Sequence, residues 1–154
     1  MSTYREHSLE GASAVDLVVA LYDGILRFLY AAGEAADRGD AVARRVAVKR
    51  ALDIIIHLQA RLRMDVGGRP AQVLSEFYAS IFAQILQASQ SASRAKFEHA
   101  IDCVRNVRDA WRQVARDPDA VGARAATSAA PPRTQAAEIA YEGSAEPAVS
   151  RWTA

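Results

Sequence analysis

The side chains that could carry out chemistry are few in this sequence, and their spacing does not suit catalysis. The three histidines, His7, His57 and His99, lack metal-ligand spacing, and the chain has no Glu-x-x-His pair of the di-iron type. Cys103 is the only cysteine and has no identifiable histidine base, so we interpret it as a buried structural thiol. The sequence GGRP at residues 67–70 lacks the lysine and glycine spacing of a phosphate-binding loop and indicates an interhelical turn. We therefore predict no enzyme, no metal site and no cofactor.

Basic side chains are concentrated between residues 41 and 70, where the net charge is +5. This segment contains two acidic residues, Asp53 and Asp65, and seven basic residues, which are Arg44, Arg45, Lys49, Arg50, Arg61, Arg63 and Arg69. A nucleic-acid site would use such a patch, but these arginines lie on the polar arc of a predicted helix without interleaved aromatic residues. We interpret them as a solvated face, or as a surface that attracts an acidic partner.

The overall composition is typical of a globular protein of one domain. The chain has 154 residues, of which 51% are hydrophobic and 24% charged, and a net charge of only +1. Asp23, Arg27 and Asp53 interrupt the longest apolar runs, so we expect no membrane insertion. The first residues, MSTYREHSLEGAS, contain no apolar signal-peptide core, and a single cysteine excludes an internal disulfide. We expect a cytoplasmic protein.

The elements that must position any binding site are four helices. Ser13 and Asp16 match an acidic capping box, Gly39 suits a left-handed helix end, and Asp40 suits the following N-cap. We expect helices over residues 13–38, 40–64 and 70–90, and a fourth helix that is capped by Ser91 or Ser93 and ends near Arg116. Loops of two to six residues between them favour antiparallel neighbours, so the predicted fold is all-α, an antiparallel up-down four-helix bundle over residues 13–117. Residues 1–12 precede the bundle as a separate N-terminal cap segment, which could be disordered or could pack back on the bundle.

The chain changes character after Asp117. Four of the five prolines lie beyond that point, and 12 of the 37 residues from 118 to 154 are alanine. Too few large apolar residues remain to offset the entropy of ordering, which predicts a disordered Ala/Pro-rich tail. Ile139, Tyr141 and Trp152 are exceptions. A short linear motif could include them, but we interpret them as scattered apolar residues.

The apolar faces of the predicted helices are wider than one core contact requires. Large apolar residues cover an arc of about 220° on the first helix and about 180° on the third, whereas one contact needs about 100° or somewhat more. The excess predicts a groove that binds amphipathic helices. We expect its partner-binding side chains to be Val19, Tyr22, Leu26, Tyr30, Ile56, Leu62, Tyr78, Phe82 and Leu86. Any of these could instead be core, Leu62 and Tyr78 above all, and neighbouring helices or residues 1–12 could cover the flanks.

A series of short motifs runs through residues 4 to 116: Tyr4, Ala12-Ser13, Leu17, Leu21-Tyr22-Asp23-Gly24, Ala51 to Leu62 followed by Gly67-Gly68, Leu74 with Tyr78, and Ala110-Trp111. In type and order they resemble the FliS family, the flagellin export chaperones, whose signature has a leading tyrosine, a T-A-S-P-like entry and an L-Y-D-G helix. The chain departs from this pattern at Gly11 (usually threonine), Ala14 (usually proline) and Arg69-Pro70 (usually glutamate after the glycines). The resemblance covers the bundle and leaves out the tail.

The resemblance implies a cytosolic four-helix bundle that binds the C-terminal helical region of flagellin and prevents its premature polymerisation. It further implies delivery of flagellin to the flagellar type III export apparatus, with an export gate component as second partner. The N-terminal segment would pack over part of the groove, so Tyr4 and Leu9 would form a removable cover. Two alternatives stay open: a helical homo-oligomer with another client, and a nucleic-acid protein that uses the arginines. We expect no nucleic-acid binding, and a monomer or weak homodimer when free.

Overall fold

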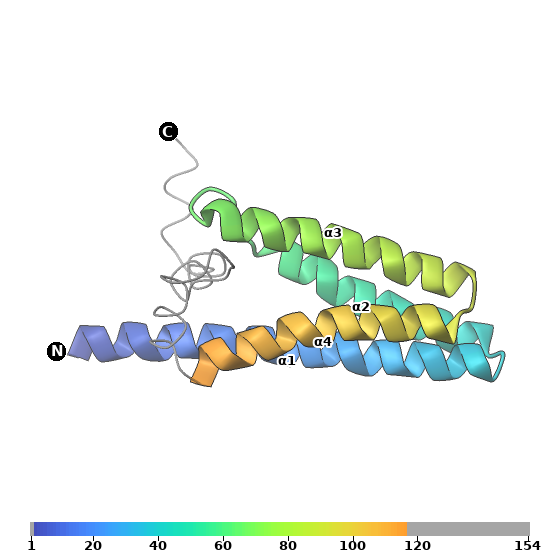
Figure 1. Ribbon diagram of the computed structural model, residues 1–154. Coiled ribbons are helices and arrows are strands. Elements are labelled where there is room, and N and C mark those ends of the chain that lie inside the picture. The colour runs from blue at the N-terminus through green and yellow to red at the C-terminus, as the bar shows by residue number, and fades with distance from the viewer. Residues whose placement is uncertain (1, 117–154) are drawn as a thin grey trace.

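Four helices joined by short turns make up the described part of the chain, which a computed structural model gives as residues 2–116, with side chains described from Ala14 onward. They are α1 (Ser2–Asp37), α2 (Ala41–Ala60), α3 (Gly68–Gln90) and α4 (Arg94–Arg116) (Figure 1). The described residues contain no strand, and the all-α prediction is confirmed. The predicted tail, residues 118–154, lies outside the described residues.

The turn between α1 and α2 has the chemistry that the sequence predicted. Gly39 has a φ of +71°, the left-handed conformation that favours glycine, and the Asp40 N–H donates to the Ala35 carbonyl at 2.9 Å. The Asp40 carboxylate then accepts a hydrogen bond from the Ala43 N–H at 2.9 Å, which caps α2. A backbone hydrogen bond therefore closes the end of α1, and a side chain caps the start of α2, so local groups fix the reversal of the chain.

The second helix ends earlier than predicted, at Ala60 instead of Met64. The N–H groups of Arg61 and Leu62 donate to the carbonyls three residues earlier, those of Leu58 and Gln59, so the last turn tightens and the α-helix stops. The chain reverses through Gly68, whose φ is +56°, and Pro70 lies in the first turn of α3 as expected.

The first helix begins at Ser2, not at Ser13. Residues 2–12 therefore continue α1 and do not form a separate element. The physical reason lies at Ala14, because alanine keeps the backbone N–H that proline would lack, and no proline occurs in residues 2–37 to stop the helix. Figure 1 shows this first part of α1 running past the ends of the other helices.

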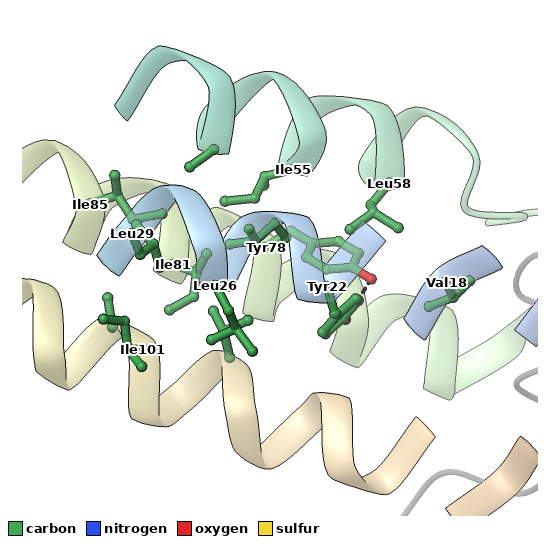
Figure 2. Close-up of a cluster of buried hydrophobic side chains, with 14 of the residues drawn as sticks. Val18, Tyr22, Leu26, Leu29, Ile55, Leu58, Tyr78, Ile81, Ile85 and Ile101 are labelled. Atoms are coloured by element: carbon green, nitrogen blue, oxygen red, sulfur yellow. Dashed lines mark hydrogen bonds between the residues drawn. The ribbon is translucent and has the colours of Figure 1, made fainter. Parts of the chain in front are cut away.

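The helices pack in an antiparallel square, and the four sides are unequal. α1 contacts α2 and α4 along most of its shared length, whereas α3 contacts α2 and α4 less extensively, with the α2–α3 side the sparsest (Figure 1). The core is continuous across all four helices. Its fully buried members include Phe97 and Trp111. They also include Leu29, Ile55, Leu58, Ile81 and Ile85, which Figure 2 labels.

The Leu-Tyr-Asp-Gly sequence at residues 21–24 ties α1 to each of the other helices. The Tyr22 hydroxyl lies 2.7 Å from the Tyr78 hydroxyl of α3, and it also hydrogen-bonds Trp111 of α4. Burial of the Tyr22 ring, fully inside the core, raises the pKa of its phenol far above the ordinary range, and the hydrogen bonds to Tyr78 and Trp111 oppose that rise. Tyr22 therefore stays neutral and acts as a structural hydrogen-bonding group.

The next two residues of this sequence complete the connections. The Asp23 carboxylate accepts a hydrogen bond from Arg108 of α4 at 2.9 Å and lies 3.7 Å from Arg112. Gly24 faces α2, where an added Cβ would lie 3.1 Å from the Ile54 Cδ1 atom. The glycine thus permits close approach of α1 and α2. This contact explains why α1 contains a glycine, although glycine lowers helix stability by about 1 kcal/mol relative to alanine.

Candidate functional site

An apolar groove of about 380 Å³ lies between α2 and α3, on the side of the bundle where the helices contact each other least. It is lined by Ile55, Ile56, Gln59 and Ala60 of α2 and by Ser75, Tyr78, Ala79 and Phe82 of α3. This volume lies in the range of ligand pockets, although here two helices form an open groove along their length.

Each helix contributes both buried and accessible side chains to this groove. Ile55 and Tyr78 belong to the core and are 2% exposed, so they form its floor. Ile56 is 54% exposed, and Phe82 is half-buried. The Gln59 amide donates to the Ser75 hydroxyl at 3.0 Å and joins the two helices. The groove therefore has a packed floor, one polar bridge and apolar walls open to a partner.

Helical spacing extends both walls beyond the groove itself. On α3, Ser75, Ala79, Phe82 and Leu86 follow one another at intervals of three or four residues, so Leu86, 38% exposed, continues the apolar strip. On α2 the same spacing gives a row of Arg45, Lys49, Leu52, Ile56 and Gln59, and Arg63 lies beyond the end of the helix. An amphipathic segment several turns long would therefore find continuous contacts.

The two walls differ in charge. Arg45 and Lys49 make the first half of the α2 row basic, and Arg63 follows in the turn after α2, whereas the α3 row carries no charged residue. Lys49 is paired with Asp53 at 3.1 Å. Arg63 is paired with Asp65 at 3.1 Å, and its hydrogen bonds lower the pKa of the exposed Asp65 carboxyl. Arg45 has no ion-pair partner among residues 14–116. The groove is thus apolar at its centre and basic along one edge.

The structure places the predicted partner-binding residues in two different environments. Ile56, Tyr78 and Phe82 line the α2–α3 groove, and Leu86 extends it. Four residues from two chain segments are thus brought together on one side of the bundle.

The other predicted residues lie elsewhere. Tyr22, Leu26 and Leu62 are buried in the core, and Leu26 points from α1 toward α4 (Figure 2). Tyr30 accepts a hydrogen bond from Arg105 of α4, and Val19 packs half-buried against the core. On this flank of α1, Leu26 is therefore buried, whereas Tyr30 contacts α4 through Arg105 and stays 46% exposed. The reason is geometric: a helix in a square bundle needs two contact faces, each about 100° wide, so an arc of about 220° does not require a client.

Tyr4 and Leu9 lie in the first turns of α1, where the structure does not describe side chains. Their role as a groove cover stays a prediction.

The sequence analysis missed Gln59, Ala60, Ser75 and Ala79, which also line the groove. Their signal was present in the helical spacing, because each lies three or four residues from Ile56 or Phe82 or from the next lining residue. None of the four is a large apolar residue, which is why the width of the apolar faces did not indicate them. Ala60, Ser75 and Ala79 are small and leave room for a partner.

The described residues give little support for a metal site or a catalytic cysteine. Residues 14–116 contain no cluster of three or more His, Cys, Asp or Glu side chains that could hold a metal. The structure does place a histidine near Cys103, contrary to our interpretation, since His99 Nε2 lies 3.9 Å from Cys103 Sγ. Cys103 is half-buried, not buried, and His99 is exposed. None of the described helices is long and apolar enough to cross a membrane.

Comparison with known proteins adds to this geometry. The sequence matches the family described as Flagellar protein FliS over residues 1–118, which includes all four helices. The chain belongs to the FliS family. The match ends two residues after α4, so the FliS region and the helical bundle coincide. The resemblance noted from the short motifs, including the Leu-Tyr-Asp-Gly sequence, is confirmed.

Individual relatives agree with the family assignment. The flagellar secretion chaperone FliS of Salmonella typhimurium is 32% identical over 110 residues, which are 71% of this chain and 82% of the relative. The FliS chaperone of Vibrio cholerae is 29% identical over 71% of this chain and 80% of its own length. That of Bacillus subtilis is 23% identical over 73% and 83%. This chain is therefore a flagellar chaperone of the FliS type.

Proposed function

We propose that this FliS protein is a cytoplasmic export chaperone whose α2–α3 groove binds an amphipathic helix from the C-terminal region of flagellin. The observation that carries the proposal is the juxtaposition of Ile56, Phe82 and Leu86 along one open apolar groove. Large contiguous apolar surfaces on soluble proteins mark interaction sites, and an amphipathic helix in a groove is an established recognition mode.

Binding would proceed by coupled folding. A terminal segment of flagellin that is disordered when free would become helical in the groove, and apolar burial would offset the entropy of ordering. While bound, the segment could not pair with another flagellin molecule, so polymerisation would be delayed. The bound pair would then be delivered to a component of the flagellar export gate. No catalytic step is required.

Calorimetry of the intact protein with the C-terminal region of flagellin tests this proposal. We expect micromolar or tighter binding, together with a gain in helical signal by circular dichroism as the client folds. A flagellin fragment that lacks the C-terminal region is the matched control and should not bind. Absence of binding by the C-terminal region would overturn the proposal. Light scattering distinguishes the competing homo-oligomer, in which the groove would be occupied by a second copy.

A further inference from the structure

One stretch of the chain outside the FliS match has the composition that the α2–α3 groove would attract. Residues 134–147 read TQAAEIAYEGSAEP and carry three glutamates, Glu138, Glu142 and Glu146, with no lysine or arginine. Ile139 and Tyr141 are the only large apolar residues of this stretch. It therefore combines apolar side chains with a charge of −3.

The groove offers the complementary surface. Its centre is apolar, and none of its lining residues carries a carboxylate. The α2 wall continues to Arg45, which has no ion-pair partner among residues 14–116, and to Lys49, which is paired with Asp53. An occupant with glutamates along the α2 side and apolar side chains toward Ile56 and Phe82 would satisfy both features. Charge complementarity of this kind selects the partner and its orientation more than it adds raw affinity.

The position at which α4 ends makes such an occupant available within the same chain. In the antiparallel bundle, the last turn of α4 lies at the end where α2 stops and α3 begins (Figure 1). The groove is near that end, because it includes Gln59 near the end of α2 and Ser75 near the start of α3. Arg116 and Ile139 are 23 residues apart, and a flexible linker of that length spans about 27 Å on average. Residues of α3 rise about 1.5 Å each, so Ala79 lies about 17 Å from the start of α3, well within reach.

We propose that residues 134–147 dock in the α2–α3 groove of their own chain and compete there with an external amphipathic helix. Docking itself needs no client, whereas the competition rests on the proposed function. A tethered segment acts at a high effective concentration, so even a weak contact would be populated. If about two thirds of the molecules held the segment in the groove, the apparent affinity for an outside helix would fall about threefold.

Methyl NMR on the full chain tests docking without any client. The δ1 methyl groups of Ile55 and Ile56 report on the groove, and that of Ile101, in the core contributed by α4, serves as the reference. The variant Ile139→Asp/Tyr141→Asp is compared with wild type, and Trp152→Asp is the matched control outside the stretch. We expect the Ile55 and Ile56 signals to shift only in the double variant, and a peptide of residues 134–147 added to that variant to restore them.

Unchanged groove signals in the double variant would overturn the proposal. Shifts that depend on protein concentration would also overturn it, because they would assign the groove to a second copy. With the C-terminal region of flagellin as ligand, the double variant should bind about threefold tighter than wild type or Trp152→Asp, if two thirds of the wild-type molecules are occupied. If the groove signals shift as expected but flagellin does not bind, docking stands and the proposed function fails.

Discussion

At the scale of single residues, the Leu-Tyr-Asp-Gly sequence is structural. Tyr22 connects α1 to α3 and α4, Asp23 holds Arg108 of α4, and Gly24 admits Ile54 of α2. Three consecutive residues on one helix thus contact all three neighbouring helices, because successive helical residues point about 100° apart. The motif that carries the family resemblance therefore specifies the bundle and leaves the groove to residues of α2 and α3.

Removing the Tyr22 hydroxyl should destabilise the bundle. Tyr22→Phe keeps the buried ring but deletes the group that hydrogen-bonds Tyr78 and Trp111, and we expect the free energy of unfolding to fall by about 1–2 kcal/mol. Chemical denaturation measures this change. Tyr30→Phe is the control, since its hydroxyl lies on the exposed side of α1, and it should change stability by less than about 0.5 kcal/mol. Equal effects of the two variants would contradict the assigned role of Tyr22.

The raised pKa of Tyr22 also predicts a pH dependence at alkaline pH. The phenol ionises near its ordinary value of 10.0 in the unfolded chain but stays protonated in the folded one, so the unfolded state loses a proton first. The stabilising contribution is therefore complete below pH 10 and is lost as the pH rises above it. The free energy of unfolding of wild type should fall more steeply than that of Tyr22→Phe, by up to about 1.4 kcal/mol per pH unit. Parallel pH profiles measured by denaturation between pH 9 and 11 would contradict this prediction.

At the scale of elements, α3 is the least firmly held helix. α1 contacts its two neighbours extensively, whereas α3 meets both α2 and α4 through sparser interfaces and leaves Phe82 and Leu86 partly uncovered. If α3 binds a partner as proposed, it can adjust its position without disturbing the α1–α4 and α1–α2 interfaces. Local stability in proteins follows contact density in this way.

Native-state hydrogen exchange should show this difference directly. We expect the amides of Ile81 and Ile85 in α3 to exchange through openings of lower free energy than those of Ile25 and Leu29 in α1. Both pairs are fully buried, so exposure does not explain a difference. Equal protection of the two helices would show that the bundle opens only as a whole.

The helices and their order could be predicted from the sequence, because caps and apolar periodicity are local signals. Gly39 and Asp40 correctly predicted the turn between α1 and α2. The start of α1 was predicted at Ser13 instead of Ser2, because Ala14, unlike proline, lets the helix continue toward the N-terminus. The sequence could not predict in the same way whether residues at the edges of the apolar helix faces are buried by a neighbouring helix or left exposed. A helical wheel gives Leu26 and Ile56 similar positions at the edge of a face, yet α4 covers Leu26 while α3 leaves Ile56 half open. Which neighbour covers which flank depends on how far apart the helices pack, and that is a property of the assembled core.

At the scale of the whole molecule, one side of the bundle is closed and the opposite side is open. Asp23, Arg105 and Arg108 complete the α1–α4 side with polar contacts, while the α2–α3 side has an apolar groove with a basic edge. The proposed function needs both properties, because a chaperone of this kind would remain folded alone and still present apolar surface to a client. We propose that this groove, and no other exposed apolar surface of α2, receives the client.

A pair of substitutions on α2 tests that claim most directly. Ile56 is 54% exposed and lines the groove, whereas Val46 is 50% exposed and lies outside it, so each can be changed to aspartate with little effect on the core. The measurement is the dissociation constant of the flagellin C-terminal region for Ile56→Asp and Val46→Asp, with circular dichroism confirming that both variants fold. We predict that Ile56→Asp weakens binding by about tenfold or more, or about 1.4 kcal/mol, and that Val46→Asp stays within about twofold of wild type. Equal affinities for the two variants, or a larger loss for Val46→Asp, would contradict the assignment of the groove.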